Sequence, residues 1–188
     1  DGRPPRVVKS LHLRNEDLEA HNDALQAKFR TIAAHEVRWA GEALEDAEVV
    51  IVAYGTAARV ARSAVADARA HGLRVGLFRP TSLWPFPSEA LAAAADGARA
   101  VLVVELSAGQ MVEDVRLAVD GRVPVLFHGR TGGMVPTPGD VLHAVRAQLR
   151  ETAGQALTSA LEALEASGDG ARSQARGGRH VERMREVL

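Results

Sequence analysis

The sequence has no cysteine at any of its 188 positions. Disulfide bonds, thiolate zinc sites and cysteine-ligated iron–sulfur clusters are therefore excluded within this chain. Aromatic residues are scarce, at 4% of the composition, and the longest apolar runs are about as long as a strand. We therefore expect no segment that crosses a bilayer. The N-terminal sequence is polar and carries no secretory signal, so we predict a soluble, cytoplasmic protein.

Neither sign of charge dominates the chain. There are 23 lysine and arginine residues against 24 aspartate and glutamate residues, and the formal net charge is -1. This balance gives no electrostatic reason to expect nucleic acid or an anionic membrane as a partner. Hydrophobic residues make up 46% of the sequence, enough for a sizeable core in one domain with extensions. Because the first residue is not methionine, we expect a piece of a longer protein.

The central part of the chain, from residue 48 to residue 151, alternates between apolar runs and helical patterns. The apolar runs predict strands at residues 49–54, 73–78, 100–104 and 124–127. One helix is expected to end near Ala70, and a second is expected to be capped by Ser88 and to reach about Ala95. Two more are expected to cover 110–119 and to run from Asp140 to Arg150. A strand–helix alternation with short loops is typical of a doubly wound α/β domain, with a mostly parallel sheet between helical layers.

The flanking segments have weaker patterns. Residues 6–13 are expected to be a strand or an extended connector, and Asn15 is expected to cap one long helix or a helical hairpin that reaches about Trp39. The polar residues 41–48 then separate this helical segment from the sheet. Residues 152–188 predict one more helix, followed by a linker rich in glycine and arginine. The predicted domain division is thus 1–47, 48–151 and 152–188.

Candidate site residues follow the predicted strands, because function in an open parallel sheet collects at the carboxyl ends of the strands. They are Gly55, Thr56, Arg79, Glu105, Gln110, Arg130, Gly132 and Gly133. Gly55 and Thr56 open a helix and could receive an anion, or they could form a tight turn that needs a small residue. The loop with Arg130 could hold a phosphate, or its glycines could let two backbones approach closely.

Other residues that could bind a metal or take part in catalysis have simpler interpretations. Glu105, Glu113 and Asp114 could form a carboxylate pair or a Mg²⁺ site, or they could be solvated acids in a first helical turn. Trp84 and Phe86 lie in a rigid, proline-flanked apolar loop that suits core or interface packing. The histidines show no metal-ligand spacing, and Gly168-Asp169-Gly170 lacks the Asn-Asn that completes a thiamine diphosphate signature. The sequence therefore indicates no metal ligand.

Four motifs occur in an order that points to one family. They are Ala53-Tyr54-Gly55-Thr56-Ala57-Ala58-Arg59, the run from Arg79 to Pro87, the run from Val104 to Arg116, and the run from Gly129 to Pro138. Together they resemble the carboxyl-terminal part of the alpha subunit of 2-oxoacid:ferredoxin oxidoreductases. The branch that looks nearest acts on 2-oxoglutarate or branched-chain 2-oxoacids. The segment with Lys9 to Leu13 and Glu19 to Asn22 resembles the connector between the two domains of that subunit.

This resemblance implies a five-stranded, three-layer α/β/α fold like the transketolase carboxyl-terminal domain, also known as domain II of pyruvate:ferredoxin oxidoreductase. It implies that the complete enzyme uses thiamine diphosphate, Mg²⁺, Fe–S clusters and coenzyme A to convert a 2-oxoacid to acyl-CoA and to reduce ferredoxin. The resemblance assigns this chain no catalytic residue, and none of these cofactors is expected to be bound by this chain alone. The implied partners are an upstream pyrimidine-type domain, a beta subunit with the diphosphate-binding half and, through other subunits, ferredoxin, in an oligomer.

Two other interpretations stay open at this point. The chain could be a non-catalytic α/β module that binds a nucleotide or coenzyme A through the loops at Gly55 and Gly132. It could also be the equivalent domain of a transketolase or of the E1 beta chain of a 2-oxoacid dehydrogenase. If the chain is instead a domain of a 2-oxoacid:ferredoxin oxidoreductase, the fragment alone is expected to be inactive and to serve as scaffold and subunit interface.

Overall fold

The computed structural model describes residues 2, 5 and 11–150. The labelled elements are α1 (Asn15–His35), β1 (Trp39–Glu42), β2 (Val49–Ala53), α2 (Gly55–Ala70), β3 (Val75–Pro80), α3 (Ser88–Ala94), β4 (Ala100–Glu105), α4 (Met111–Val119) and β5 (Val125–Gly129). One further helix covers residues 138–150. The chain divides into two units, residues 1–142 and 143–188, and all the labelled elements belong to the first. None of the helices within residues 11–150 has the apolar length that spanning a bilayer would take.

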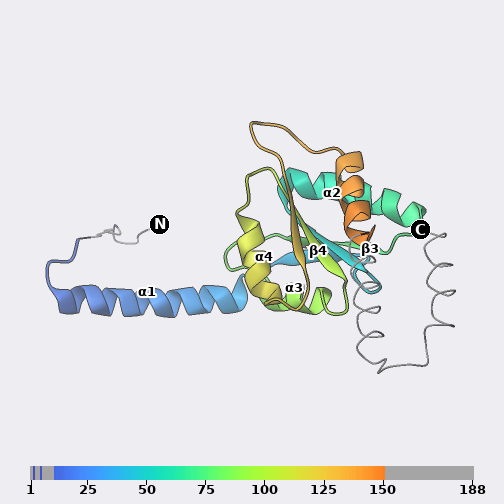
Figure 1. Ribbon diagram of the computed structural model, residues 1–188. Helices are drawn as coiled ribbons and strands as arrows, with labels where there is room; N and C mark the ends of the chain where they lie inside the picture. The colour runs from blue at the N-terminus through green and yellow to red at the C-terminus, as the bar shows by residue number, and fades with distance from the viewer. Residues whose placement is uncertain (1, 3–4, 6–10, 151–188) are drawn as a thin grey trace, which may run out of the picture. The chain divides into compact units, whose positions relative to one another are not determined.

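The five strands form one sheet in the order β1-β3-β2-β4-β5 (Figure 1). Strands β3, β2, β4 and β5 are parallel to one another, whereas β1 pairs antiparallel with β3 at one edge. All five residues of β2 and all six of β4 are buried, as expected for central strands that helices cover on both faces. The predicted doubly wound, mostly parallel sheet is therefore confirmed, and the number of strands agrees with the family resemblance.

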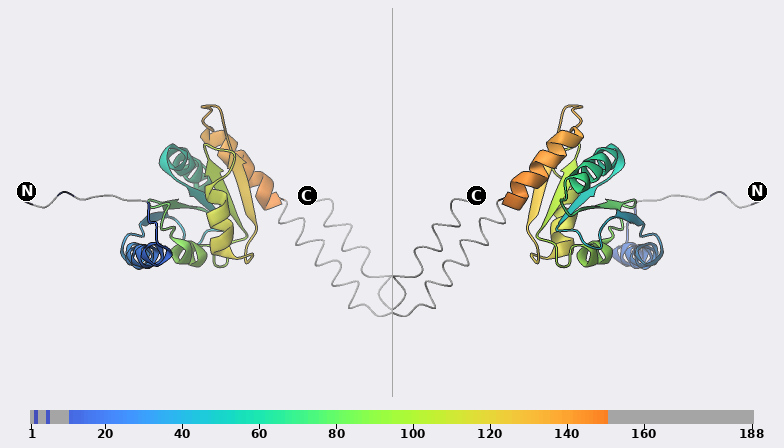
Figure 2. Two further views of the ribbon diagram at one scale, coloured as in Figure 1. Left: turned by 90° about the vertical axis from the view of Figure 1, so that its left-hand side faces the viewer. Right: turned by 90° about the vertical axis from the view of Figure 1, so that its right-hand side faces the viewer.

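Helices cover both faces of this sheet (Figures 1 and 2). Helices α3 and α4 pack on the face that carries Val50 and Val52. Because side chains alternate along a strand, Val49 and Ile51 point to the opposite face, where α2 lies. The buried side of α2 consists mainly of alanine, so its backbone can approach the strands closely. These three layers are the architecture that the sequence and the resemblance predicted.

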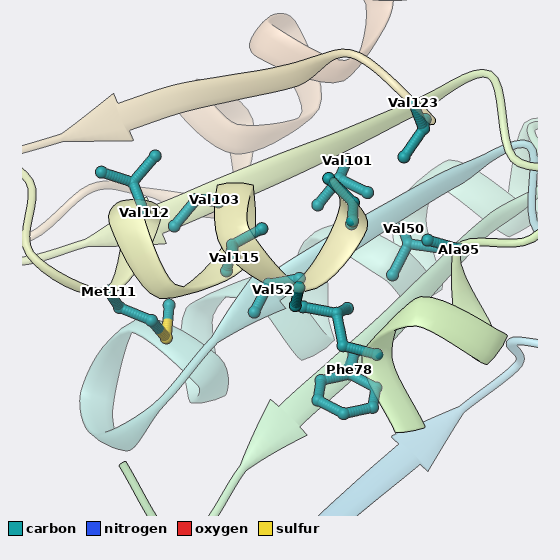
Figure 3. Close-up of a cluster of buried hydrophobic side chains, with 13 residues drawn as sticks. Val50, Val52, Phe78, Ala95, Val101, Val103, Met111, Val112, Val115 and Val123 are labelled. Atoms are coloured by element: carbon teal, nitrogen blue, oxygen red, sulfur yellow. The ribbon is translucent and has the colours of Figure 1, made fainter. Parts of the chain in front are cut away.

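A group of buried side chains lies between the sheet and the α3–α4 layer (Figure 3). The strands contribute Val50, Val52, Phe78, Val101 and Val103, and the helices contribute Leu91, Ala95, Met111, Val112, Val115, Ala118 and Val119. Burying an aliphatic side chain of this size contributes roughly 1.5–3 kcal/mol to folding. This cluster therefore fixes α4, and with it the loop that joins β4 to α4.

Strand β1 is absent from the predicted elements. The sequence predicted helix as far as Trp39 and a polar separator from residue 41, but α1 ends at His35 and Trp39–Glu42 is a strand. The helix ends because the following backbone bonds to the sheet domain instead: the Arg38 carbonyl accepts the N–H groups of Thr81 and Ser82. The Trp39 ring then stacks on Phe78, with 4.9 Å between ring centroids.

The predicted helix starts shift by a few residues. Arg14, not Asn15, is the N-cap of α1, and Pro87, not Ser88, precedes α3. The last described helix starts at residue 138 rather than at Asp140. There, Thr137 and Asp140 bond reciprocally, from backbone N–H to side-chain oxygen, at 2.8 and 3.1 Å. Asp140 therefore sits inside a capping box and does not start the helix.

Several expectations concern residues outside the described part of the chain. These are the extended connector before residue 11, the helix and Gly/Arg-rich segment after residue 151, and Gly168-Asp169-Gly170. The three-part domain division stays a prediction; the four parallel strands and α2 to α4 lie after residue 48, whereas β1 of the same sheet lies before it. At the end of α2, His71 is the C-cap as predicted, and Gly72 has a φ of 77°.

Candidate functional site

The topology has a switch point between the carboxyl ends of β2 and β4. These strands are neighbours, but the chain leaves β2 into α2 on one face and leaves β4 into α4 on the other. Loops that diverge in this way leave a gap above the strand ends, where ligands of doubly wound folds bind. The candidate functional site is therefore this edge, formed by the segments that follow β2, β4 and β5.

The strand register shows which predicted residues share the edge. Ala53 pairs with Val104, and Glu105 pairs with Gly129. Three adjacent strands therefore end side by side at the same edge of the sheet. The segments that follow them are Gly55 and Thr56, residues 105–110 and residues 129–133. Arg79 lies on β3, three strand spacings or about 14 Å from β5, so the backbone does not bring it together with Arg130.

The Glu105 side chain is completely buried at the end of β4. Its carboxylate accepts the backbone N–H groups of Met111 and Val112 at 3.2 and 3.0 Å. It also accepts the Gln110 N–H at 3.1 Å and the Ser107 hydroxyl at 3.0 Å. Free N–H groups and the positive end of the helix dipole stabilise a carboxylate at this place. Glu105 therefore serves as a cap for α4 that comes from the preceding strand.

This geometry corrects the interpretation of the three acids. Glu105 is not a solvated acid, and its oxygens are directed to the first turn of α4. Glu113 and Asp114 do lie in that first turn, and Glu113 pairs on the surface with Arg116 at 2.6 Å. Within residues 11–150 no three His, Asp or Glu side chains gather as metal ligands would. The acids therefore have separate structural roles.

The loop after β5 approaches the loop after β4 closely. The Arg130 backbone N–H donates to the Glu105 carbonyl at 3.1 Å. A Cβ atom on Gly129 would overlap the Ser107 carbonyl oxygen and the Phe127 ring, so only glycine fits there. Gly132 and Gly133 have φ values of 63° and 80° and face open space. Close backbone approach thus explains Gly129, whereas Gly132 and Gly133 shape an exposed turn.

The start of α2 differs from the start of α4. Gly55, with a φ of 57°, and Thr56 are both exposed. The N-cap Tyr54 makes no side-chain cap hydrogen bond, and the first turn contains no acidic residue. This helix end can therefore accept an anion, whereas Glu105 already occupies the N–H groups of α4. Gln110 is exposed beside that occupied end, and its own N–H is bound by Glu105.

Trp84 and Phe86 have different environments within their loop. Phe86 is half-buried against the core cluster. Trp84 is 61% exposed and meets the Phe29 ring of α1 edge to face, at 5.5 Å between centroids. Of the two residues expected in core or interface packing, Phe86 packs on the core and Trp84 lies on the surface.

The sequence did not predict one group of side chains at this edge, which surrounds Asp140. The backbone N–H and side chain of Thr137 hold the pKa of Asp140 below its ordinary value, and the charges of Arg130 and His128 act in the same direction. His128 Nε2 is buried and has no hydrogen-bond partner among the described residues. The spacing Thr-Pro-Gly-Asp could have indicated the capping box. Nothing in the sequence indicated that His128 and Arg130 lie close to it.

Comparison with known proteins decides the family. A family model described as pyruvate:ferredoxin oxidoreductase core domain II matches residues 47–141. That range covers half of the chain and includes the sheet from β2 to β5. The chain belongs to this family. The resemblance of the four ordered motifs to the 2-oxoacid:ferredoxin oxidoreductases is thereby confirmed for the core domain II.

Curated relatives are subunits of 2-oxoacid oxidoreductases. Ketoisovalerate oxidoreductase subunit VorB of Methanothermobacter thermautotrophicus is 46% identical over 140 residues, which cover 74% of this chain and 40% of VorB. The 2-oxoglutarate synthase subunit KorA of Methanothermobacter marburgensis is 33% identical over 101 residues, which cover 54% of this chain and 27% of KorA. The chain thus spans less than half the length of these relatives.

Solved structures show the same fold for this core domain II. The chain matches a 2-oxoglutarate:ferredoxin oxidoreductase from Magnetococcus marinus, solved with 2-oxoglutarate, coenzyme A and succinyl-CoA bound. The TM-score is 0.63 at 23% identity, and the match covers 73% of this chain and 24% of that one. A split-gene transketolase, an inactive beta4 tetramer, matches with a TM-score of 0.50 at 25% identity, over 59% of this chain and 41% of that one. The predicted transketolase-like architecture is confirmed.

Proposed function

We propose that this chain is the carboxyl-terminal domain of the alpha subunit of a thiamine diphosphate-dependent 2-oxoacid:ferredoxin oxidoreductase. The complete enzyme would oxidatively decarboxylate a 2-oxoacid, form acyl-CoA and reduce ferredoxin, while this domain would serve as scaffold and subunit interface. The observation that carries the proposal is the 46% identity with a ketoisovalerate oxidoreductase subunit over most of the chain. The fold shared with a coenzyme A-bound oxidoreductase supports it.

The identities also favour one class of 2-oxoacid. The two VorB subunits are 46% and 43% identical to this chain, whereas the KorA subunits are 33% to 34% identical. We therefore propose ketoisovalerate, a branched-chain 2-oxoacid, as the substrate of the complete enzyme. An assay of the purified complex with both acids tests this proposal. A higher kcat/KM for ketoisovalerate than for 2-oxoglutarate is expected, and the reverse order would contradict it.

The residues of this chain do not fit the cofactors of the complete enzyme. Iron–sulfur clusters need thiolate ligands, and the sequence has no cysteine. Mg²⁺ needs oxygen ligands, but the buried carboxylate of Glu105 already accepts four donors. We therefore place thiamine diphosphate, Mg²⁺, the clusters and coenzyme A on the preceding domain, the beta subunit and other subunits.

The candidate edge would then serve as the contact surface toward the cofactor-binding domains. Gly55 and Thr56 offer backbone N–H groups, and Arg130 offers a cation beside the exposed turn of Gly132 and Gly133. Trp84 adds an exposed aromatic ring. Arg130→Ala in the complete complex tests this role, and a lower activity with unchanged subunit composition is expected. Arg99→Ala is the control, because Arg99 lies just before β4, at the opposite end of the strand.

The inactivity of the isolated chain is a direct test of the scaffold role. The 188-residue chain is incubated with ketoisovalerate, thiamine diphosphate, Mg²⁺, coenzyme A and a viologen dye as electron acceptor. No dye reduction is expected from the chain alone, and reduction is expected once the other subunits are added. Turnover by the chain alone would refute the proposal.

A nucleotide- or coenzyme A-binding module is the second candidate function. The observation in its favour is the uncapped, acid-free first turn of α2 behind the exposed Gly55. Calorimetry of the isolated chain with coenzyme A and with ATP separates the two candidates. Micromolar binding by the chain alone would favour the module, whereas the scaffold role predicts no measurable heat.

A further inference from the structure

A row of arginines lines the side of α2 that faces β1. Arg69, near the end of α2, pairs with Asp46 at 2.6 Å. Two turns earlier, Arg62 pairs with Glu42 of β1. Because α2 runs back from the carboxyl end of β2, the second of these ion pairs lies closer to the carboxyl ends of the parallel strands than the first. Each of these two arginines is thus neutralised by an acid from β1 or from the segment after it.

The next arginine of this row, Arg59, has no acid opposite it. Arg59 precedes Arg62 by three residues, so it lies on the same side of the helix, about 4.5 Å nearer to the start of α2. On β1, the residue about 6.6 Å beyond Glu42 in the same direction and on the same face is Ala40. The first turn of α2 contains no acidic residue either. Arg59 is exposed, and among the described residues its side chain has no hydrogen-bond or ion-pair partner.

A second arginine without a partner lies at the same level. Arg79 of β3 pairs with Ala40 in the register of the sheet. The preceding residue, Phe78, points to the α3–α4 face, so Arg79 points to the opposite face, where α2 packs. Its side chain is exposed and makes no hydrogen bond or ion pair with the part of the chain that the structure describes. Two guanidinium groups therefore share one piece of surface with no acid of this chain between them.

The rest of the chain enters the sheet domain on the other face. Helix α1 meets the loop before α3, where Phe29 contacts Trp84 and where Ala33 and Ala34 line a hollow with residues 85–90. In Figure 1, α1 and α3 lie on one side of the sheet and α2 on the other. A domain that precedes α1 is therefore led toward the α3 face, and the arginines beside α2 face a different neighbour.

We propose that Arg59 and Arg79 form a docking site for aspartate or glutamate side chains of another subunit of the complete enzyme. The two preceding arginines of the row are each satisfied by one carboxylate, and a guanidinium group binds a carboxylate through two parallel hydrogen bonds. An acidic segment that continues the row beyond Glu42 would pair with both arginines.

The exposure of both side chains favours a protein surface as the partner, because small anionic ligands are usually held in concave sites. The docking site specifies the subunit-interface role proposed above and rests on it. It is separate from the edge with Arg130, which lies three strand spacings from β3.

Zero-length cross-linking tests the site, because the chain has only two lysines, Lys9 and Lys28. Arg59→Lys and Arg79→Lys keep the charge and add an amine that a carbodiimide couples to a carboxylate in contact with it. In the complete complex, each variant is expected to give a new cross-link to an aspartate or glutamate of another subunit. Arg30→Lys, exposed on α1, is the control and should give none. No new cross-link from either variant, or cross-links only within the same polypeptide, would overturn the proposal.

Charge reversal separates docking from folding. Arg59→Glu/Arg79→Glu should weaken the association of the complete subunit with its partner subunit by about tenfold or more, measured from the dissociation of the diluted complex. The free energy of unfolding of the isolated 188-residue chain should not fall, because neither arginine has a partner among the described residues. Arg30→Glu, the matched control, should leave association unchanged.

The other outcomes of this experiment distinguish the docking site from the proposed function. If the double variant associates as tightly as the native protein in a complex that oxidises a 2-oxoacid, the docking site is wrong and the proposed function stands. Normal association with a raised KM for coenzyme A would assign the arginines to that ligand and would also overturn the docking site. A native complex that oxidises no 2-oxoacid would overturn the proposed function, and the docking site with it.

Discussion

A charged side chain can be a structural element when its surroundings supply enough donors, and Glu105 is such a residue. Burial of an unpaired carboxylate is strongly unfavourable, so buried acids need hydrogen bonds or counter-charges. Glu105 accepts three backbone N–H groups of α4 and one hydroxyl, and the Ser107 oxygen accepts the Gly109 N–H in turn. The end of β4, its loop and the start of α4 are therefore held by one carboxylate.

Substitution Glu105→Gln tests this capping role. The amide would turn a donor toward backbone N–H donors, so at least one acceptor site would be lost in a buried position. We expect the free energy of unfolding to fall by about 2–4 kcal/mol, more than for an ordinary hydrogen bond. Urea denaturation measures this change in the free energy of unfolding. Glu113→Gln, on the same helix but on the surface, should change stability by less than about 1 kcal/mol, and equal effects would contradict the role of Glu105.

Asp46 makes stability depend on pH at the opposite end of the sheet. Hydrogen bonds and the charge of Arg69 lower the pKa of Asp46 below its ordinary value of 3.8, and Arg69 also donates to the Ala43 and Val75 carbonyls. The lowered pKa means that the ion pair stabilises the fold above about pH 4 and that this contribution is lost as the pH falls through the folded pKa.

The expected consequence is a stability difference that vanishes in acid. Asp46→Asn should be less stable than the native chain at pH 7 and equally stable once Asp46 is protonated in both states. Urea denaturation from pH 7 down to pH 3 measures the difference. In an Arg69→Ala background the same substitution should have no further effect, because the partner is gone. A difference that is constant with pH would contradict the assignment to this pair.

At the scale of elements, the sequence predicts the buried strands better than the edge. Strands β2 and β4 are continuous apolar runs, and such runs have few other interpretations. Strand β1 has four residues, half of them exposed, with a glycine in the middle, so no period-2 or apolar signal exceeds that of the preceding helix. Its position depends on the pairing with β3 and on the stacking of Trp39 on Phe78, both of which are tertiary contacts.

The sequence predicted where the candidate site lies, but not what its side chains do there. The rule that strand ends collect function located Gly55, Glu105 and Arg130 at one edge, as the register shows. The same rule also selected Arg79, which lies three strand spacings from β5. The sequence could not tell that the carboxylate of Glu105 turns back onto α4, because a solvated acid and a buried cap have the same sequence pattern.

Gly76 on β3 leaves room for the backbone of the connection between β1 and β2, which passes close to it. A Cβ atom at this position would lie 2.6 Å from the Ala43 carbonyl oxygen, which is backbone. We expect Gly76→Ala to lower the free energy of unfolding by about 1–3 kcal/mol, since the connection would have to move. Gly72 is the matched control, because it has a φ of 77° in open space. Gly72→Asn should cost less than about 1 kcal/mol, as asparagine tolerates that conformation, and a larger loss than for Gly76→Ala would contradict the steric account.

At the scale of the whole molecule, the contacts between elements divide residues 11–142 into a sheet domain and a helix attached at its edge. Sheet, α2, α3 and α4 share continuous buried surfaces, whereas α1 contributes no buried residue. Among the described residues, the attachment includes the Phe29–Trp84 ring contact and the backbone bonds of Arg38 to Thr81 and Ser82. Ala33 and Ala34 also line a hollow together with residues 85–90. The stability of the sheet domain should therefore be nearly independent of α1.

Removal of residues 1–35 tests this independence. The shortened chain keeps Arg38 and β1, so its free energy of unfolding should differ from that of the full chain by less than about 1 kcal/mol. Removal of residues 1–42 also takes away β1 and the Trp39 ring on Phe78, and this loss should cost about 3 kcal/mol or more. If both deletions destabilise the domain equally, α1 belongs to the same cooperative unit as the sheet, and the independence is contradicted.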